Sequence, residues 1–338
     1  MRMRTIATLA GVLAAALWAA PAQAKLVYVK QAGTVDSAVY VARDGGEDER
    51  RLGLGRAPTI APNGRWVAYV AARAGGSQKD TVVLQKLRSG SQRLVMRSDS
   101  VDTLRFSPDS TRLATIADRK RVRLYDIADG TLRTAARGHI RGYSFSPDSQ
   151  RLVFGDARSA GSEARSDLFI APVDGGAQPQ RLTSVRNAIN PVWGAEEIVF
   201  DRFERRPDAM PAFDLWAVAP GAGDRLRRLT RLTLPPLASG LVPLEISADA
   251  RRMLAVFTGQ DTELGFTVAT RSGRTRALST DFESGVVGFD LSSDGSTILA
   301  HTGGADPQAA HNVVAVPYGG EREPEVLVEG AAYPDWTR

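Results

Sequence analysis

The sequence contains no cysteine among its 338 residues. A disulfide, a thiolate nucleophile and a lipid-modified N-terminal cysteine are therefore all excluded. Because the first residues indicate export, a hydrophobic core alone must hold the protein together in an oxidising compartment. The composition suits such a core, since 43% of the residues are hydrophobic and the chain is long enough to bury many of them.

Histidine is almost as scarce, with only His139, His301 and His311 in the whole chain. No two of them show the H-x-x-x-H spacing of a metal-binding pair, and no motif links them to a carboxylate. The pattern favours structural histidines, with a shared metal site as the alternative.

Clustered positive charge is also missing. The formal net charge is +5, and the arginines are scattered among acidic residues, which argues against nucleic-acid binding. The sequence has no phosphate loop, dinucleotide fingerprint, calcium loop or G-x-S-x-G nucleophile motif. We therefore expect a non-catalytic protein that uses no cofactor.

The N-terminus has the pattern of a secretory signal over residues 1–24. Two arginines precede an apolar run from Ile6 to Ala20, and Ala22-Gln23-Ala24 places small side chains where a signal peptidase reads them. The run is shorter than the roughly 20 residues of a membrane-spanning helix. We expect cleavage after Ala24 and a mature chain, residues 25–338, that forms one domain without a membrane span.

The pentapeptide FSPDS occurs at Phe106–Ser110 and again at Phe145–Ser149. Looser copies share a turn that is followed by an apolar run. The anchor residues of all the copies are Ile60, Phe106, Phe145, Trp193, Ile246 and Leu291. A period in the forties with four short strands in each unit is the signature of a β-propeller blade.

The repeated pentapeptide predicts a hairpin corner rather than a catalytic site. Pro108 and Pro147 are expected to fix φ at the second position of a tight turn. Asp109 and Asp148, and Asp294 in a later copy, are expected to accept hydrogen bonds from the local backbone and hold the turn closed. The phenylalanine before each corner is expected to wedge between neighbouring blades.

The two ends of the mature chain predict how the propeller closes. KLVYVK at residues 25–30 has the pattern of a second strand, whereas Tyr333–Arg338 has that of a first strand. Trp336 falls on the blade period after Leu291. We therefore expect an all-β fold, a seven-bladed β-propeller of four-stranded antiparallel blades, in which the C-terminal strand joins the N-terminal blade. Six blades are the alternative.

The FSPD corner and the strand after it resemble the TolB-like family of WD-type propeller repeats, also called PD repeats. The resemblance covers essentially the whole mature chain and implies the propeller fold. It implies no activity, because unrelated functions use this fold. Similar propellers precede the hydrolase domain of prolyl oligopeptidases, and the missing nucleophile motif predicts that no such domain is present here.

The longest expected loops, 156–167, 201–213 and 302–312, emerge on one face of the predicted propeller. The middle loop is rich in arginine, whose forked guanidinium group suits carboxylates. Loops on a rigid scaffold commonly carry binding specificity. The candidate residues for binding a partner are Arg202, Arg205, Arg206, His139, His301 and His311.

The predicted function is a secreted or periplasmic, monomeric scaffold that binds another protein or a cell-envelope component, such as peptidoglycan. The alternative is a metal-dependent carbohydrate-active enzyme, similar to a polysaccharide lyase, that uses the same face.

The signal assignment predicts the N-terminus of the exported protein. N-terminal sequencing of protein purified from the periplasm or medium of a secreting host should begin at Lys25. Soluble exported protein that begins at Met1 would contradict it.

Overall fold

The computed structural model describes residues 24–73, 77–157, 165–206, 209–232, 238–259, 262–278, 285–292, 294–304, 310–320 and 323–337. The predicted signal therefore lies outside the described residues, apart from Ala24. Every regular element in these ranges is a β-strand. None of the described segments is a helix that could span a bilayer.

The strands pair with their neighbours in the sequence, and nearly all pairings are antiparallel. The first sheet contains β27 (Ala331–Trp336), β1 (Lys25–Lys30), β2 (Ala38–Arg43), β3 (Arg50–Ile60), β4 (Trp66–Ala71), β5 (Asp80–Lys86) and β6 (Gln92–Ser98). The second sheet contains β7 (Val101–Phe106), β8 (Arg112–Ala117), β9 (Arg121–Asp126) and β10 (Leu132–Arg137). The third sheet contains β11 (His139–Phe145), β12 (Arg151–Ala157), β13 (Ser166–Pro172) and β14 (Gln180–Arg181).

The remaining strands form a large sheet and a final four-stranded one. The large sheet contains β15 (Ala188–Trp193), β16 (Ile198–Arg206), β17 (Ala209–Val218), β18 (Arg227–Arg228), β19 (Ala238–Ile246), β20 (Arg252–Gly259), β21 (Thr262–Ala269) and β22 (Thr275–Ala277). A single parallel contact between β17 and β19 joins its two halves. The final sheet contains β23 (Val287–Leu291), β24 (Thr297–His301), β25 (Asn312–Pro317) and β26 (Glu325–Glu329).

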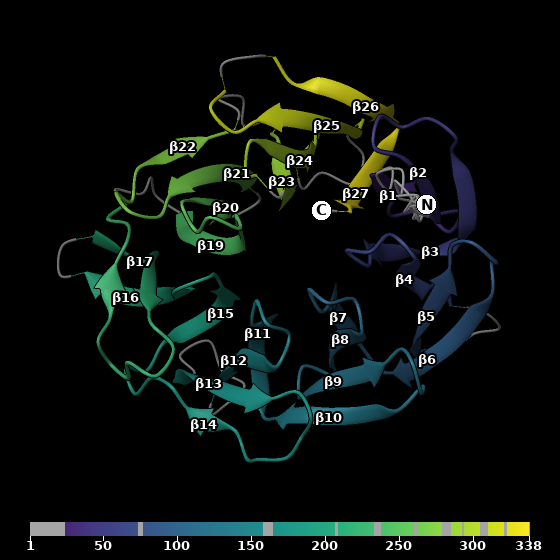
Figure 1. Cartoon of the computed structure of the whole chain (residues 1–338). Helices are drawn as coiled ribbons and strands as arrows, with labels where there is room; N and C mark the ends of the chain where they lie inside the picture. The colour runs from purple at the N-terminus through teal and green to yellow at the C-terminus, as the bar shows by residue number, and fades with distance from the viewer. Residues whose placement is uncertain are drawn as a thin grey trace, which may run out of the picture.

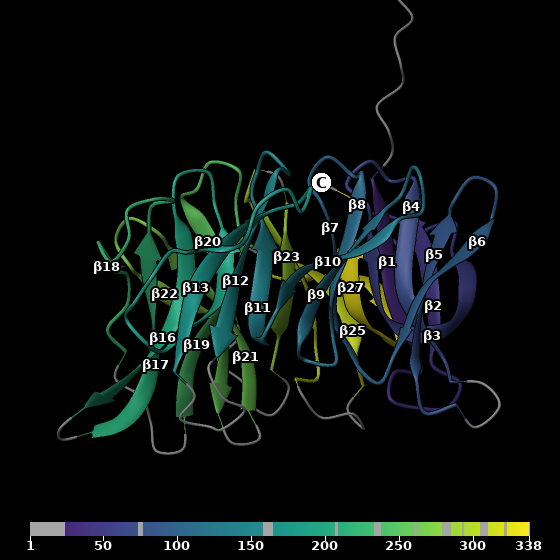
Figure 2. The same cartoon turned by 90° about the horizontal axis from the view of Figure 1, so that it is seen from below.

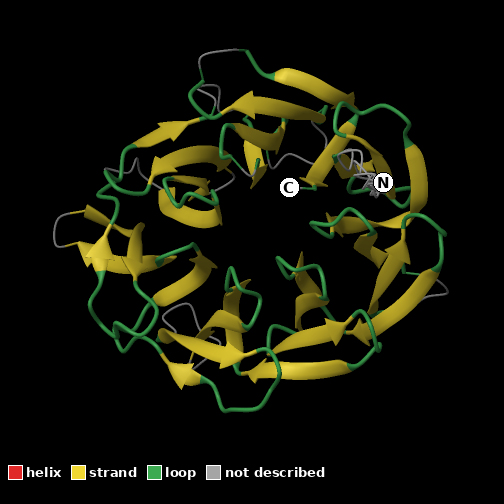
Figure 3. Ribbon diagram, viewed as in Figure 1, coloured by secondary structure: helices red, strands yellow, loops and turns green. Residues whose placement is uncertain are grey.

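The sheets are arranged around a common centre, with strands such as β7, β11 and β23 innermost and β10, β14 and β26 outermost (Figure 1). Loops join these strands throughout the part that the structure describes (Figure 3). The innermost strands run between two faces of the molecule (Figure 2). We call the face where they end the corner face and the opposite one the loop face.

The core consists of separate clusters, each between neighbouring sheets. Phe106 packs with residues of β4 and β5 as well as those of β8, and Phe145 joins β8 and β9 to β12. Trp193 packs with side chains of β12 and β13. These side chains are buried. The prediction that the residue before each corner wedges between neighbouring sheets is therefore confirmed at all three positions.

The two ends of the chain meet in one sheet. β27 pairs antiparallel with β1, so that Leu26 lies opposite Trp336. The Asp335 carboxylate accepts hydrogen bonds from the Thr59 hydroxyl at 2.7 Å and the Ile60 amide at 2.9 Å, which ties β27 to β3 as well. Trp336 itself is only half-buried, because it lies at the margin of the cluster formed by β1, β24 and β25.

The repeated pentapeptide folds as the tight turn that the sequence predicts. The Ser110 amide donates to the Ser107 carbonyl oxygen at 2.8 Å, which puts Pro108 at the second turn position. Asp109 accepts from the Thr111 amide at 3.0 Å. Equivalent turns occur at Ser146–Ser149, which contains Pro147.

The last serine of the pentapeptide links one corner to the corner before it. The Ser110 hydroxyl accepts from the Asn63 amide, and the Ser149 hydroxyl accepts from the Asp109 amide, both at 3.0 Å. Ser110 and Ser149 adopt positive φ angles of 61° and 60°. The repeat therefore fastens neighbouring sheets together on the corner face, in addition to closing its own turn.

A second repeated contact lies inside the sheets. The Asp167 carboxylate accepts from Arg181 at 2.6 Å, and the Thr183 hydroxyl accepts from the Leu168 amide at 3.0 Å. The same arrangement recurs around the fully buried Asp214, which binds Arg228. Each buried carboxylate is thus paired and fixes an outermost strand to its neighbour.

The corner aspartates make the fold sensitive to acid. The Ser146 hydroxyl and the Gln150 amide lower the pKa of Asp148, and the Ser292 hydroxyl and the Ser296 amide lower the pKa of Asp294 to about 2. Since the folded state favours the ionised form, this stabilisation is complete above the ordinary pKa of 3.8 and is lost as the pH falls towards 2.

We expect the melting temperature to fall steeply between about pH 4 and pH 2. Asp148→Asn should flatten this dependence, whereas Asp36→Asn, at an exposed position outside the corners, should leave it unchanged. Thermal melts followed by circular dichroism across this range provide the measurement. The same slope in all three proteins would show that the corners do not cause the acid sensitivity.

The pairing of β27 with β1 predicts a large effect of truncation. Deleting Tyr333–Arg338 removes the backbone partners of β1 and the Asp335 contacts, and should cost at least about 3 kcal/mol of unfolding free energy. Asp335→Ala alone should cost about 1–3 kcal/mol. Denaturant melts measure both values, and a truncated protein as stable as the full chain would contradict the role of this strand.

Candidate functional site

Each innermost strand carries a bulge in its pairing with the second strand of its sheet. Phe289 is the extra residue of β23, and Tyr333 lies in the bulge of β27. Other innermost strands place smaller residues at their bulges: Ala57, Thr103 and Asn190. A bulge leaves a residue out of the hydrogen-bond ladder and redirects its side chain. The two aromatic bulge residues are therefore distinctive.

These two aromatic residues contact two histidines. The ring centroids of Phe289 and Tyr333 are 5.9 Å apart, and that of His301 lies 4.8 Å from Phe289 and 5.3 Å from Tyr333. The His311 ring stacks on His301 at 5.0 Å. We call these four residues the aromatic cluster. Tyr333 is 46% exposed and His301 only 2%, so tyrosine presents the cluster to solvent.

His301 of the aromatic cluster is uncharged at neutral pH. Burial, with a smaller effect of His311, lowers the pKa of His301 to about 3. Its Nδ1 atom is buried and has no hydrogen-bond partner within the described residues. The His311 Nδ1–H donates to the Thr302 carbonyl oxygen at 2.8 Å, which fixes the orientation of the His311 ring.

The histidine pair does not have the geometry of a metal site. The lone pairs of an imidazole lie in the ring plane, so two histidines that bind one ion need planes that meet at that ion. The planes of His301 and His311 are only 10° apart and stacked, and therefore do not converge near the rings. No group of three candidate ligands occurs among the described residues.

The segment expected as a long loop at 201–213 is instead a β-hairpin. β16 and β17 continue through most of it, and the hairpin projects from the loop face (Figure 2). Phe203 lies opposite Phe213, with ring centroids 5.2 Å apart. This aromatic pair extends the hairpin beyond the sheet, which corrects the prediction of an irregular charged loop.

Arg202 lies within this hairpin and is already engaged. Its guanidinium group is 5.0 Å from the Trp216 ring centroid, and Arg228 lies over the same ring at 5.5 Å. Arg202 is also 3.8 Å from a carboxylate oxygen of Glu204. These contacts make Arg202 a structural residue of the hairpin as much as a candidate for partner binding.

The other candidate residues are not brought together with the aromatic cluster. His139 is the first residue of β11, rather than part of a connection, and its amide donates to Asp156 at 2.8 Å. It belongs to a different sheet from His301 and His311. Arg205 and Arg206 lie in β16, but their side chains are outside the described part of the chain.

Phe289 and Tyr333 are not among the candidate binding residues that the sequence predicts. The repeat period places Tyr333 only in the C-terminal strand expected over Tyr333–Arg338, whose anchor is Trp336. A bulge has no reliable local sequence signal here, because Phe289 and Tyr333 occupy positions where other innermost strands have alanine or threonine. Only the three-dimensional pairing shows that both side chains are redirected.

No protein family model and no curated protein sequence matches this chain. Solved structures do match. TolB from Acinetobacter baumannii is 14% identical with a TM-score of 0.55, over 93% of this chain and 66% of that chain. The β-propeller domain of the Trilobed protease from Pyrococcus furiosus is 12% identical with a TM-score of 0.67, over 91% of this chain and 95% of that one.

An oligogalacturonate lyase in complex with manganese is also similar, at 13% identity and a TM-score of 0.61, over 91% of this chain and 86% of that chain. These similar structures include TolB as well as enzymes, so they do not decide between a binding protein and a catalyst. What they share is the architecture: the protein has the fold of a TolB-like β-propeller.

Proposed function

We propose that the chain forms a seven-bladed propeller closed by β27. Seven pairings of an innermost strand with a second strand support this count: β27–β1, β3–β4, β7–β8, β11–β12, β15–β16, β19–β20 and β23–β24. The strand β3 is long enough to serve as the outer strand of one blade and the inner strand of the next. Six blades would leave one of these pairings without a blade.

We propose further that this propeller is an exported, non-catalytic scaffold of the periplasm or the medium. Its partner is another protein or a cell-envelope component, bound at the loop face by the aromatic cluster. The observation that carries this proposal is the half-exposed Tyr333 of β27, which packs against Phe289 of β23 and His301 of β24. A rigid aromatic surface contributes contact area at a low cost in conformational entropy.

The chemistry of the cluster suits an apolar or planar group better than an ion. His301 is neutral, and the described contacts of Phe289 and Tyr333 are with other rings. A sugar ring or an apolar side chain of a partner fits such a surface. The β16–β17 hairpin projects from the same face of the molecule and belongs to a different sheet from the cluster.

The rival proposal is a metal-dependent carbohydrate-active enzyme. Its support is the histidine pair on the loop face and the shared fold of the manganese-bound lyase. The nearly parallel ring planes of His301 and His311 argue against a common ion. Bound metal separates the two proposals, because the enzyme needs a divalent ion in this site and the scaffold does not.

We expect mature protein, equilibrated with manganese or zinc and then dialysed, to retain less than about one tenth of an ion per chain, since two stacked imidazoles cannot converge on one ion. Elemental analysis by mass spectrometry gives the ratio. Stoichiometric metal that disappears in the His311→Ala variant would favour the enzyme instead.

We expect Tyr333→Ala to reduce capture of the partner from a solubilised envelope extract at least about tenfold, because truncating a central aromatic anchor typically costs 2 kcal/mol or more. Tyr333→Phe keeps the ring and should bind normally. Leu54→Ala removes a similarly exposed apolar side chain from another strand and serves as the control.

Quantitative mass spectrometry of captured proteins and glycans provides the measurement, with melting temperatures to verify that all variants are folded. Equal capture by Tyr333→Ala and the unaltered protein would show that the binding surface lies outside the aromatic cluster. An extract from which the unaltered protein enriches nothing would contradict the scaffold itself.

A further inference from the structure

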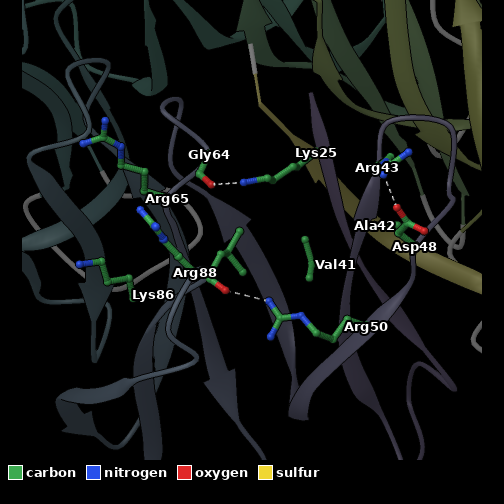
Figure 4. Close-up of a pocket in the computed structure, with 11 residues that line it drawn as sticks. Lys25, Val41, Ala42, Arg43, Asp48, Arg50, Gly64, Arg65, Lys86 and Arg88 are labelled. Atoms are coloured by element: carbon green, nitrogen blue, oxygen red, sulfur yellow. Dashed lines mark hydrogen bonds and ion pairs between the residues drawn. The ribbon is translucent and has the colours of Figure 1, made fainter. Parts of the chain in front are cut away.

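A hollow lies on the corner face, on the opposite side of the molecule from the aromatic cluster. It has a volume of about 800 Å³ and lies between the β1–β2 hairpin and the strands β4 and β5 (Figure 4). Its apolar floor includes Val41, Ala42 and Leu87, all of which are buried. This volume is that of a small-molecule site rather than of a shallow surface depression.

Cationic side chains surround this floor. Arg65, Lys86 and Arg88 lie on one side of the hollow, with Lys25 and Arg50 across from them (Figure 4). We call these five residues the cationic pocket. None of the five has a carboxylate partner among the described residues. The pocket lining also includes Arg43 and Asp48, which pair with each other at 2.5 Å.

Three of the five cations have uncharged partners: Lys86 Nζ lies 5.7 Å from the centroid of the Trp66 ring, and Lys25 and Arg50 each donate to a backbone carbonyl oxygen. Lys25 Nζ donates to the Gly64 carbonyl oxygen at 2.7 Å, and Arg50 donates to that of Leu87 at 3.1 Å. A carbonyl oxygen orients a cation without neutralising it. Gly64 adopts a left-handed backbone conformation with a φ angle of 64°, which favours glycine at this position.

Elsewhere in the described chain, arginines with acidic neighbours are common. Arg181 binds Asp167 at 2.6 Å, and Arg227 binds Glu197 at 2.5 Å. Five like charges around one hollow repel one another and lower stability, unless a counter-charge is supplied from outside. The contrast points to a ligand that provides the missing negative charge.

We propose that the cationic pocket binds a compact small-molecule polyanion, with two or more phosphate or carboxylate groups. The number of cations exceeds what a monovalent ion needs, and the guanidinium groups of Arg50, Arg65 and Arg88 can each grip two oxygens of such a group. The hollow is too small for a folded partner. This site is separate from the proposed loop-face function, and neither depends on the other.

The test measures binding of two probes to the full mature chain by isothermal titration calorimetry at low ionic strength. Tripolyphosphate represents phosphate ligands and citrate represents carboxylate ligands. The double variant Arg65→Gln/Arg88→Gln removes two cations of the pocket. The matched control, Arg271→Gln/Arg274→Gln, removes two exposed arginines from a turn on the same face and changes the net charge equally.

We expect the unaltered protein to bind at least one probe, and the pocket variant to bind it at least about tenfold more weakly, since each charge-assisted contact is worth over a kcal/mol. The control should change the dissociation constant less than about twofold. The preferred probe identifies the anionic group. Equal weakening in both variants, or no binding of either probe, would overturn the proposal.

Discussion

Each sheet of this protein is covered by its neighbours, and this mutual burial is the constraint on which the rest of the structure depends. The clusters around Phe106, Phe145 and Trp193 each combine side chains from adjacent sheets. A sheet with two apolar faces needs a neighbour on both sides. The last cluster combines Leu26 and Tyr28 of β1 with Leu299 of β24, so the first and last sheets of the chain cover each other.

The same mutual burial of sheets determines where the aromatic cluster forms. Tyr333 comes from β27, and Phe289, His301 and His311 come from the last sheet, so the aromatic cluster exists only where the chain ends meet. On the corner face, by contrast, serine links and an ion pair between Arg105 and Glu245 at 3.2 Å join strands far apart in sequence. These contacts hold the inner strands together at the corner face.

The sequence was sufficient to predict the repeated parts of the fold. The corners, their prolines and aspartates, and the strand that follows each of them have strong local signals, because turn chemistry and alternation act within a few residues. The period also predicted a strand at the C-terminus, and this strand pairs with β1. The hairpin at 201–213 was missed because its charges and prolines are typical of a loop. The pairing of Phe203 with Phe213 is visible only once the register of β16 and β17 is known.

The candidate sites were harder to predict, for a different physical reason. Lys25, Arg50, Arg65 and Arg88 come from separate segments of the first two blades, and nothing local marks them as neighbours. The scattered charges argued against nucleic-acid binding and did not indicate a pocket for a small anion. Net charge describes the whole molecule, whereas a pocket depends on which few cations the strands bring together without acidic partners.

Both proposed sites meet at one pair of strands. Lys25 begins β1 and reaches into the cationic pocket, and β1 pairs with β27, which carries Tyr333. The Lys25 amide donates to the Thr337 hydroxyl at 2.9 Å, and Asp335 ties β27 to β3. A ligand at one site alters the other only if this strand pair has two arrangements. These hydrogen bonds favour a single arrangement, so we infer that the pairing of β27 with β1 pre-organises both sites without coupling them.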